Sequence, residues 1–208
     1  MNSNYPIIVR LDGKKAVVIG GGRVAERKVT RLLGTGALIT VISPIATDEL
    51  KRLASIGLIR WRVKSFSKED LEGAFLIFAA TNDNVVNQTI KEAASEQQLV
   101  NMADDPDGSD FHVPSHFQRG RLSISVSTGG ASPTLAGKIK EQLESQFDEQ
   151  FEDYVEFLFS ARQRILQEVK EPSRKREILS AIVSEEFLKS PDREADFLRL
   201  LHNKRNDV

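Results

Sequence analysis

Three consecutive glycines, Gly20-Gly21-Gly22, stand where a short β-branched run ends and a helix-like stretch begins. Together with Ala25 they match the pattern G-x-G-x-x-[GA], which is typical of loops that bind the pyrophosphate of a dinucleotide. Gly20 permits the tight turn, Gly22 lets the backbone approach a phosphate closely, and Ala25 is small enough for close packing of helix on strand. The alternative is a plain strand–helix turn that needs glycine only for a positive φ.

The residues that open the following helix, Arg23 and Val24, are expected to complete the phosphate site. Their N–H groups have no partner inside the first helical turn, and the positive end of the helix dipole lies beside them. The strand, the motif, the helix and a second strand follow one another in the expected register. We therefore predict a dinucleotide-binding site at Gly20, Gly22, Arg23 and Val24.

One part of the usual fingerprint is missing. An acidic residue about twenty positions further on commonly accepts hydrogen bonds from the adenosine ribose, but Ser43-Pro44 stands at this place. Ser43 can still bind a ribose hydroxyl, although it does not repel a 2′-phosphate as a carboxylate does, and no arginine stands in the same loop. The predicted cofactor is NAD, with Ala80 and Thr81 at the end of another apolar run as further contacts.

Acidic residues cluster in the segment DDPDGSD, which covers residues 104–110. A carboxylate that follows a strand at the cofactor edge of a sheet can act as a general base, and Asp104 holds that place. From the sequence alone, a turn whose carboxylates only point into water explains this cluster equally well. The carboxylate spacing does not match a calcium loop, and no glutamate closes it.

Histidines and hydroxyl groups provide the other candidates. Pro114 between His112 and His116 prevents the single helical face that paired metal ligation needs, so no fixed metal site is predicted. His116 is either a residue that contacts the substrate or moves protons, or a structural histidine. The glycine-rich segment 127–133 contains Thr128 and opens a helix, so its N–H groups could bind carboxylates.

Basic residues near that segment could meet anionic side arms, or could be ordinary surface charges: Arg119, Arg121 and Lys138.

The overall composition excludes several classes of protein. The chain has 208 residues, 40% of them hydrophobic and 28% charged, and a formal net charge of −1, so no global field attracts nucleic acid or a membrane surface. It has no cysteine, which excludes disulfides and thiolate chemistry. The N-terminus lacks a signal pattern and no apolar run reaches the length of a membrane span. We expect a cytoplasmic protein that binds neither nucleic acid nor membrane.

The elements that position these residues alternate between strand and helix in the first half of the chain. Such alternation is typical of βαβ units and predicts an open parallel α/β sheet with helices on both faces. The expected strands are 16–19, 38–42, 59–63, 76–80 and 99–102, and the expected helices are 24–33, 47–55 and 84–97, with a capping-box turn at 67–70. After Met102 the sequence reads as a turn-rich stretch, a half-exposed strand at 121–127, and helices from Ser132-Pro133 to the end.

Several motifs resemble, in order, those of the precorrin-2 dehydrogenase family, the siroheme-synthase module. They lie between about Tyr5 and Leu143: GGGRVAERK, TVISP, FAATND, VNQ, NMADDP, FHVPS and VSTGGASP. The resemblance implies a Rossmann domain at 1–113, a dimerisation segment at 114–147 and a helical C-terminal domain at 148–208. It also implies an intertwined homodimer that oxidises precorrin-2 to sirohydrochlorin with NAD.

The resemblance assigns Asp104 as the catalytic aspartate and places Thr128 where related proteins carry serine. The tetrapyrrole carries acetate and propionate groups, which Thr128, Arg119 and Lys138 are expected to bind. A middle segment of one strand and one amphipathic helix is also too small to bury its own apolar face, so we expect a twin to complete it. Two alternatives remain: an additional sirohydrochlorin ferrochelatase activity in the same cavity, and a dinucleotide-sensing domain without chemistry.

Overall fold

The computed structural model describes residues 4–202, so the outermost residues of the expected domains at 1–113 and 148–208 lie outside the described residues. The chain divides after Val113 into two compact units, which are described separately below. No helix in the described range is long and apolar enough to cross a lipid bilayer.

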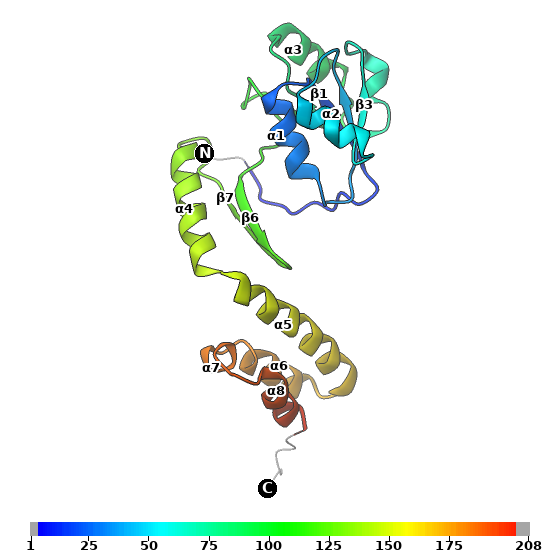
Figure 1. The fold of residues 1–208 in the computed structure, drawn as a ribbon. Coiled ribbons are helices and arrows are strands. Elements are labelled where there is room, and N and C mark those ends of the chain that lie inside the picture. Colours follow the sequence, from blue (N-terminus) through cyan, green and yellow to red (C-terminus); the bar gives the residue numbers. More distant parts are fainter. Residues whose placement is uncertain (1–3, 203–208) are drawn as a thin grey trace. The chain divides into compact units, whose positions relative to one another are not determined.

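The first unit is a parallel five-stranded sheet with the strand order β3-β2-β1-β4-β5 (Figure 1). This order confirms the α/β sheet expected from the alternating pattern. The elements are β1 (Lys15–Ile19), α1 (Arg23–Leu32), β2 (Leu38–Ile42), α2 (Asp48–Ser55), β3 (Arg60–Arg62), the 3-10 helix η1 (Lys68–Leu71), β4 (Ala74–Ala79), α3 (Asn84–Ala93) and β5 (Leu99–Met102).

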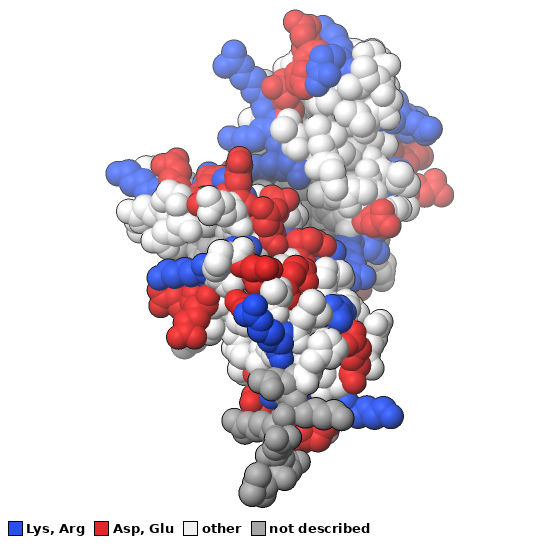
Figure 2. All heavy atoms as spheres, turned by 60° about the horizontal axis from the view of Figure 1, so that its bottom comes forward, with Lys and Arg blue, Asp and Glu red and all other residues white. Residues whose placement is uncertain are grey.

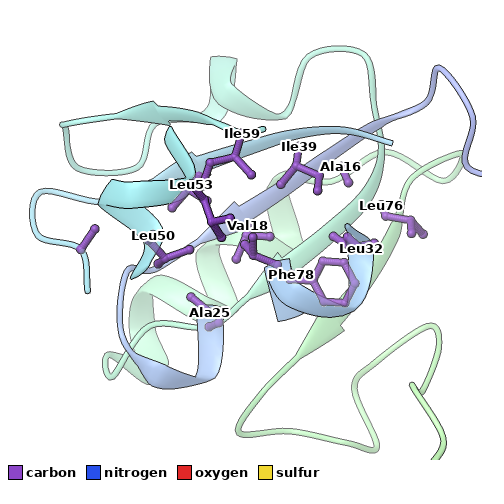
Figure 3. Packing of buried hydrophobic residues seen from close by; sticks show 14 residues of the cluster. Ala16, Val18, Ala25, Leu32, Ile39, Leu50, Leu53, Ile59, Leu76 and Phe78 are labelled. Atoms are coloured by element: carbon purple, nitrogen blue, oxygen red, sulfur yellow. The ribbon is translucent and has the colours of Figure 1, made fainter. Parts of the chain in front are cut away.

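Both faces of the sheet are buried, because alternate residues of each strand point to opposite sides. On one face, Ala16 and Val18 of β1 pack with residues of α1 and α2; Figure 3 shows the side chains of Leu32, Leu50 and Phe78 directed into this cluster. On the other face, Val17 and Ile19 pack with Leu71 of η1 and Ile90 of α3. The strands therefore read as continuous apolar runs rather than as alternating ones.

Side chains cap the starts of α2 and α3 in this unit, but not the start of α1. The side chain of Thr47 accepts from the N–H of Leu50 at the start of α2, and that of Asp83 accepts from two N–H groups at the start of α3. Helix α1 begins at Gly22 without a side-chain cap. Helix α3 ends at Ala93, earlier than the predicted residue 97, because Ser95 donates its N–H to the Gln98 side chain and closes a turn.

The second unit starts with a two-stranded antiparallel hairpin, β6 (Ser115–Arg119) and β7 (Leu122–Val126). Strand β6 was not predicted, since prolines and aspartates dominate the preceding segment. Its one buried residue, Phe117, lies opposite Ile124 of β7. Five helices follow: α4 (Pro133–Gln146), α5 (Glu149–Glu168), α6 (Pro172–Ala181), α7 (Glu185–Leu188) and α8 (Arg193–His202).

The helical core of this unit lies between α5, α6 and α8, around Ile165, Ile178 and Phe197. The helical spacing of Phe159 with Phe151, Val155 and Leu158 predicts a core position, but Phe159 is 39% exposed. The guanidinium of Arg121 lies 3.5 Å from its ring centroid. The apolar stripe of α4 is incompletely covered, since Leu135 at its start is 50% exposed. Helix α4 thus keeps an apolar face that the described part of this chain does not bury.

Candidate functional site

A cavity of about 700 Å³ opens at the carboxyl edge of the sheet, which is where open α/β sheets bind their ligands. It is lined by the glycine loop after β1, the loop after β2, the segment after β3, the turn after β4 and part of α3. The lining residues are Ile19, Gly20, Gly21, Gly22, Ile42, Ser43, Pro44, Ile45, Ala46, Thr47, Ser65, Phe66, Ala80, Thr81, Asn82, Val86 and Thr89.

Two of the three glycines are required by the protein itself. Gly20 has φ +122°, and a Cβ at this position would lie 2.2 Å from the carbonyl oxygen of Ala80. A Cβ on Gly21 would lie 1.9 Å from the carbonyl oxygen of Ile45 and 2.7 Å from Oγ of Ser43. The close approach of the β1, β2 and β4 loops therefore excludes a side chain at both positions.

Gly22 differs from its neighbours. Its backbone is extended, with φ −85°, a conformation that any residue adopts. A Cβ at Gly22 would meet no protein atom within 4 Å. The space beside it is open and lies at the start of α1, so only a ligand would require glycine here.

The start of α1 suits a bound diphosphate. No side chain caps the first turn, which leaves its N–H groups available to an anion. Arg23 at the first helical position is exposed and has no hydrogen bond or ion pair with any residue in the described range. A cation at a helix N-terminus is unfavourable beside the helix dipole, and a bound diphosphate would reverse this. Arg23 and Val24 lie just beyond the cavity lining.

Ser43 is held in a defined orientation at the end of β2. Its hydroxyl donates to the carbonyl of Ile45 at 2.6 Å, and its carbonyl accepts from Nε1 of Trp61 at 3.0 Å. The side chain is buried, and its single proton is already used. Ser43 can therefore only accept a further hydrogen bond, as the carboxylate of the usual fingerprint does.

Thr81 is positioned by a residue that sequence reasoning missed. Asn87 on α3 is fully buried; its Oδ1 accepts from the N–H and the hydroxyl of Thr81, and its Nδ2 donates to the Thr81 carbonyl. These three hydrogen bonds fix the turn after β4 at the cavity wall. The sequence did offer a signal for this role: Asn87 is a polar residue in the first turn of the helix that directly follows the turn at Thr81.

The segment after β3 supplies Ser65 and Phe66 to the cavity, and neither was predicted. Asp70 anchors this segment: Lys64 and Arg62 form ion pairs of 2.8 Å with its buried carboxylate, and Ser67 donates its N–H to it. Burial raises the pKa of Asp70, but these donors and charges outweigh it and hold the pKa below its ordinary value. The expected capping box of Ser67 and Asp70 is present.

Asp104 lies two residues beyond β5, on the same edge of the sheet as the cavity, although it does not line it. Its side chain is exposed and forms no hydrogen bond with any described residue. Its acidic neighbours differ: Asp105 accepts from the N–H of Gly108, and Asp110 accepts from the N–H of Val100 and pairs with Lys91. The turn residues hold the loop and leave Asp104 free.

The remaining candidates belong to the second unit. His116 is exposed on β6, with Nδ1 3.1 Å from the carbonyl of Pro114. Thr128 donates its hydroxyl to the carbonyl of Ser132 and accepts from the N–H of the same residue. That reciprocal contact closes the loop before α4.

The basic residues of this unit differ in whether their side chains already have partners. Arg121 forms an ion pair with Glu156, at 2.7 Å, and its guanidinium lies over the ring of Phe159. Arg119 lies 3.6 Å from Glu144 and has a buried Nε without a partner in the described structure. Lys138 is exposed. Within residues 4–202, no group of three or more histidine, aspartate or glutamate side chains could hold a metal ion.

Comparison with family models divides the chain into three matched regions. Residues 7–115 match a model of NAD(P)-binding domains, residues 119–146 match the central domain of sirohaem biosynthesis proteins, and residues 151–197 match the C-terminal domain of SirC. The fold and the site thus define a dinucleotide-binding protein of the Rossmann type, and the expected cofactor, NAD, is confirmed.

A curated relative from Priestia megaterium, named precorrin-2 dehydrogenase, is 37% identical over 94% of this chain and 96% of its own length. The chain therefore belongs to the precorrin-2 dehydrogenase family, as the motifs indicated. A solved structure of SirC, precorrin-2 dehydrogenase, superimposes with a TM-score of 0.83 at 36% identity and covers 97% of this chain and all of its own. Siroheme synthase 3 of Aeromonas hydrophila is 38% identical over 77% of this chain, which spans 34% of that longer protein.

Proposed function

We propose that this protein catalyses the NAD-dependent dehydrogenation of precorrin-2 to sirohydrochlorin in siroheme biosynthesis. The observation that carries the proposal is the uncapped start of α1 beside open space at Gly22, in a chain that matches a precorrin-2 dehydrogenase over nearly its full length. A dinucleotide sensor would need the same loop. It would not need a free carboxylate beyond β5.

Each candidate residue has a role in this proposal. The first-turn N–H groups of α1 and Arg23 bind the diphosphate, Ser43 accepts from the adenosine ribose, and Ala80 with Thr81 makes room near the nicotinamide ribose. When bound, NAD supplies the hydride acceptor. Asp104 takes the proton that leaves the macrocycle, so that a hydride and a proton are removed together.

The second unit is proposed to bind the tetrapyrrole. Thr128 holds the loop whose N–H groups receive carboxylates, Arg119 and Lys138 supply positive charge, and His116 contacts the substrate or moves a proton.

We also propose the domain arrangement and the homodimer that the sequence suggests: a Rossmann domain at 1–113, a dimerisation segment at 114–147 and a helical domain at 148–208. Support comes from the hairpin and from the half-exposed apolar stripe of α4, because a two-stranded hairpin with one helix is marginal without a partner surface. Light scattering at micromolar concentration should give twice the chain mass. A stable monomer there contradicts the dimer.

The lack of cysteine supports a cytoplasmic location.

The decisive experiment is anaerobic incubation of the protein with NAD and enzymatically made precorrin-2. The expected result is the sirohydrochlorin absorption spectrum appearing together with NADH. Protein without NAD is the first control, and it should leave precorrin-2 unchanged. NAD binding without turnover would favour a dinucleotide-sensing domain without chemistry. A separate assay with added sirohydrochlorin and Fe(II) would reveal a chelatase activity if iron is inserted into the macrocycle.

A further inference from the structure

Helix α1 carries four cationic side chains on one flank. Arg23, Arg27 and Arg31 follow one another at four-residue spacing, and Lys28 lies between this row and the core. The buried side of the helix is formed by Ala25, Val29 and Leu32. Glu26, the only acidic residue of the helix, lies three residues after Arg23 and therefore beside it, but it points away from Lys28 and Arg31, since the helix turns by about 100° per residue.

The direction of the cationic flank is given by Lys28. Its Nζ donates to Oδ1 of Asn101 on β5 at 2.7 Å and lies 5.5 Å from the ring centroid of Phe78 on β4. Lys28 therefore points to the half of the sheet formed by β4 and β5, and Arg31 and then Arg27 follow it around the helix toward solvent. Asp104 follows Asn101 by three residues on this half, where the proposed chemistry takes place.

Asn101 in turn ties this flank to the loop that carries Asp104. Its side chain is buried, and its Nδ2 donates to the carbonyl of Phe111 at 2.9 Å. One continuous set of contacts thus joins Lys28, the end of β5 and the loop that starts at Asp104.

The cations on this flank lack anionic partners. Arg27 and Arg31 are exposed and form no ion pair or hydrogen bond with any residue in the described range, whereas Arg62 and Lys64 share Asp70 and Lys91 pairs with Asp110. Figure 2 shows Lys and Arg side chains on the surface of the first unit, with Asp and Glu side chains beside them in several places.

Like charges four residues apart destabilise a helix, and Arg27 and Arg31 are such a pair. Burial first, and then the charges of Arg27 and Arg31, lower the pKa of Lys28 from 10.5 to about 8. Arg31 lies in the last turn, where the helix dipole favours a cation. The dipole explains neither Arg27 nor the half-buried Lys28. A solvated surface face would be expected to intersperse acids, but no acidic residue stands three or four positions from Arg27, Lys28 or Arg31.

We propose that Arg27, Lys28 and Arg31 form a binding site for carboxylate groups of the tetrapyrrole substrate. The inference rests on the proposed function and extends it, because it places substrate recognition on the cofactor-binding helix itself. Arg27 and Arg31 are separated by about 6 Å along the helix axis, so two side arms of one macrocycle can be held at once. Arginine binds carboxylates with paired N–H donors.

The test uses the double variant Arg27→Gln/Arg31→Gln in the full chain. Both side chains are exposed and unpartnered, so the melting temperature should not fall. The matched control is Arg60→Gln/Lys68→Gln, which removes the same charge from two exposed side chains of β3 and η1 that lie outside the cavity lining and form no ion pair in the described range. Steady-state rates with precorrin-2 at several salt concentrations give kcat and KM, and calorimetry gives the Kd of NAD.

The double variant should raise the KM for precorrin-2 about tenfold, as expected for the loss of a charged contact, with kcat changed less than about threefold and an unchanged Kd for NAD. Added salt should raise the KM of the wild type and of the control more than that of the variant. An unchanged KM in an enzyme that still oxidises precorrin-2 would overturn the inference alone. A weakened NAD affinity would assign the flank to the cofactor and also overturn it. A wild type inactive toward precorrin-2 would remove the proposed function and the inference with it.

Discussion

Substituting Gly22 by aspartate should abolish NAD binding without harming the fold. The extended backbone at Gly22 accepts a side chain, and its Cβ would point into open space. Aspartate is also a preferred residue at the start of a helix, because its carboxylate accepts from the N–H groups of the first turn. The free energy of unfolding of Gly22→Asp should therefore stay constant or rise by a few tenths of a kcal/mol.

The same carboxylate occupies the N–H groups that a diphosphate needs, and it repels the diphosphate charge. Two like charges about 4 Å apart near a protein surface repel by about 4 kcal/mol, which corresponds to an affinity loss of about 10³-fold. Gly22→Asn is the matched variant, because asparagine caps the helix equally well and carries no charge. It should lose less affinity than Gly22→Asp, and the difference isolates the electrostatic part.

Calorimetry with NAD and thermal unfolding of the same samples separate the two effects. Gly20→Ala provides the opposite pattern: its Cβ would lie 2.2 Å from the Ala80 carbonyl oxygen at a φ of +122°, so stability should fall by about 2 kcal/mol or more. If Gly22→Asp binds NAD with wild-type affinity while remaining folded, the diphosphate does not lie at the start of α1.

Three further predictions follow from the same geometry. Asp104→Ala should lower turnover by about 10²–10⁴-fold with an unchanged Kd for NAD, while Asp107→Ala, a turn residue, should have little effect in the same assay; equal rates for both variants would make Asp104 structural. Asp70→Asn should lower the free energy of unfolding by about 2 kcal/mol, less than for a fully buried pair because Arg62 and Lys64 are partly solvated; chemical denaturation at pH 7 measures it, and no loss would contradict the anchoring role. Because the pKa of Lys28 is about 8 in the folded protein against an ordinary 10.5, the unfolded chain binds more protons between these values, so stability should rise with pH across this window, and Lys28→Gln should show a smaller rise in urea titrations from pH 7.5 to 10.

The sequence by itself was sufficient for the class of fold and for the phosphate loop. Apolar runs that alternate with helical patterns leave few arrangements besides a parallel sheet, and the glycines stand where β1 meets α1. The helix starts at Thr47 and Ser132 could also be located, because capping depends on neighbouring residues alone. Each of these features is local, so its signal lies within a few consecutive residues.

Strand β6 shows where local reasoning failed. Residues 115–119 contain one buried apolar side chain, Phe117, and their strand conformation depends on pairing with β7 rather than on their own pattern. The prediction for Phe159 was wrong in the opposite way, because a local pattern was present but misleading. Its helical spacing indicated a core position, whereas the Arg121 guanidinium covers its ring. Tertiary partners decided both outcomes.

Only the tertiary structure decided which protein atoms exclude a side chain at each glycine and which charged residues find partners. The motif predicted the tight turn at Gly20 and the phosphate approach at Gly22, but it gave Gly21 no role. In the structure the carbonyls of Ala80 and Ile45 leave no space for a side chain at Gly20 and Gly21, whereas Gly22 faces open space. In the same way, the sequence indicates no special role for Lys28 in its helix. Only the structure shows that Asn101, 73 residues further along, accepts its hydrogen bond. Contacts of this kind join residues that are distant in the chain, and no local pattern encodes the distance at which two loops finally pack.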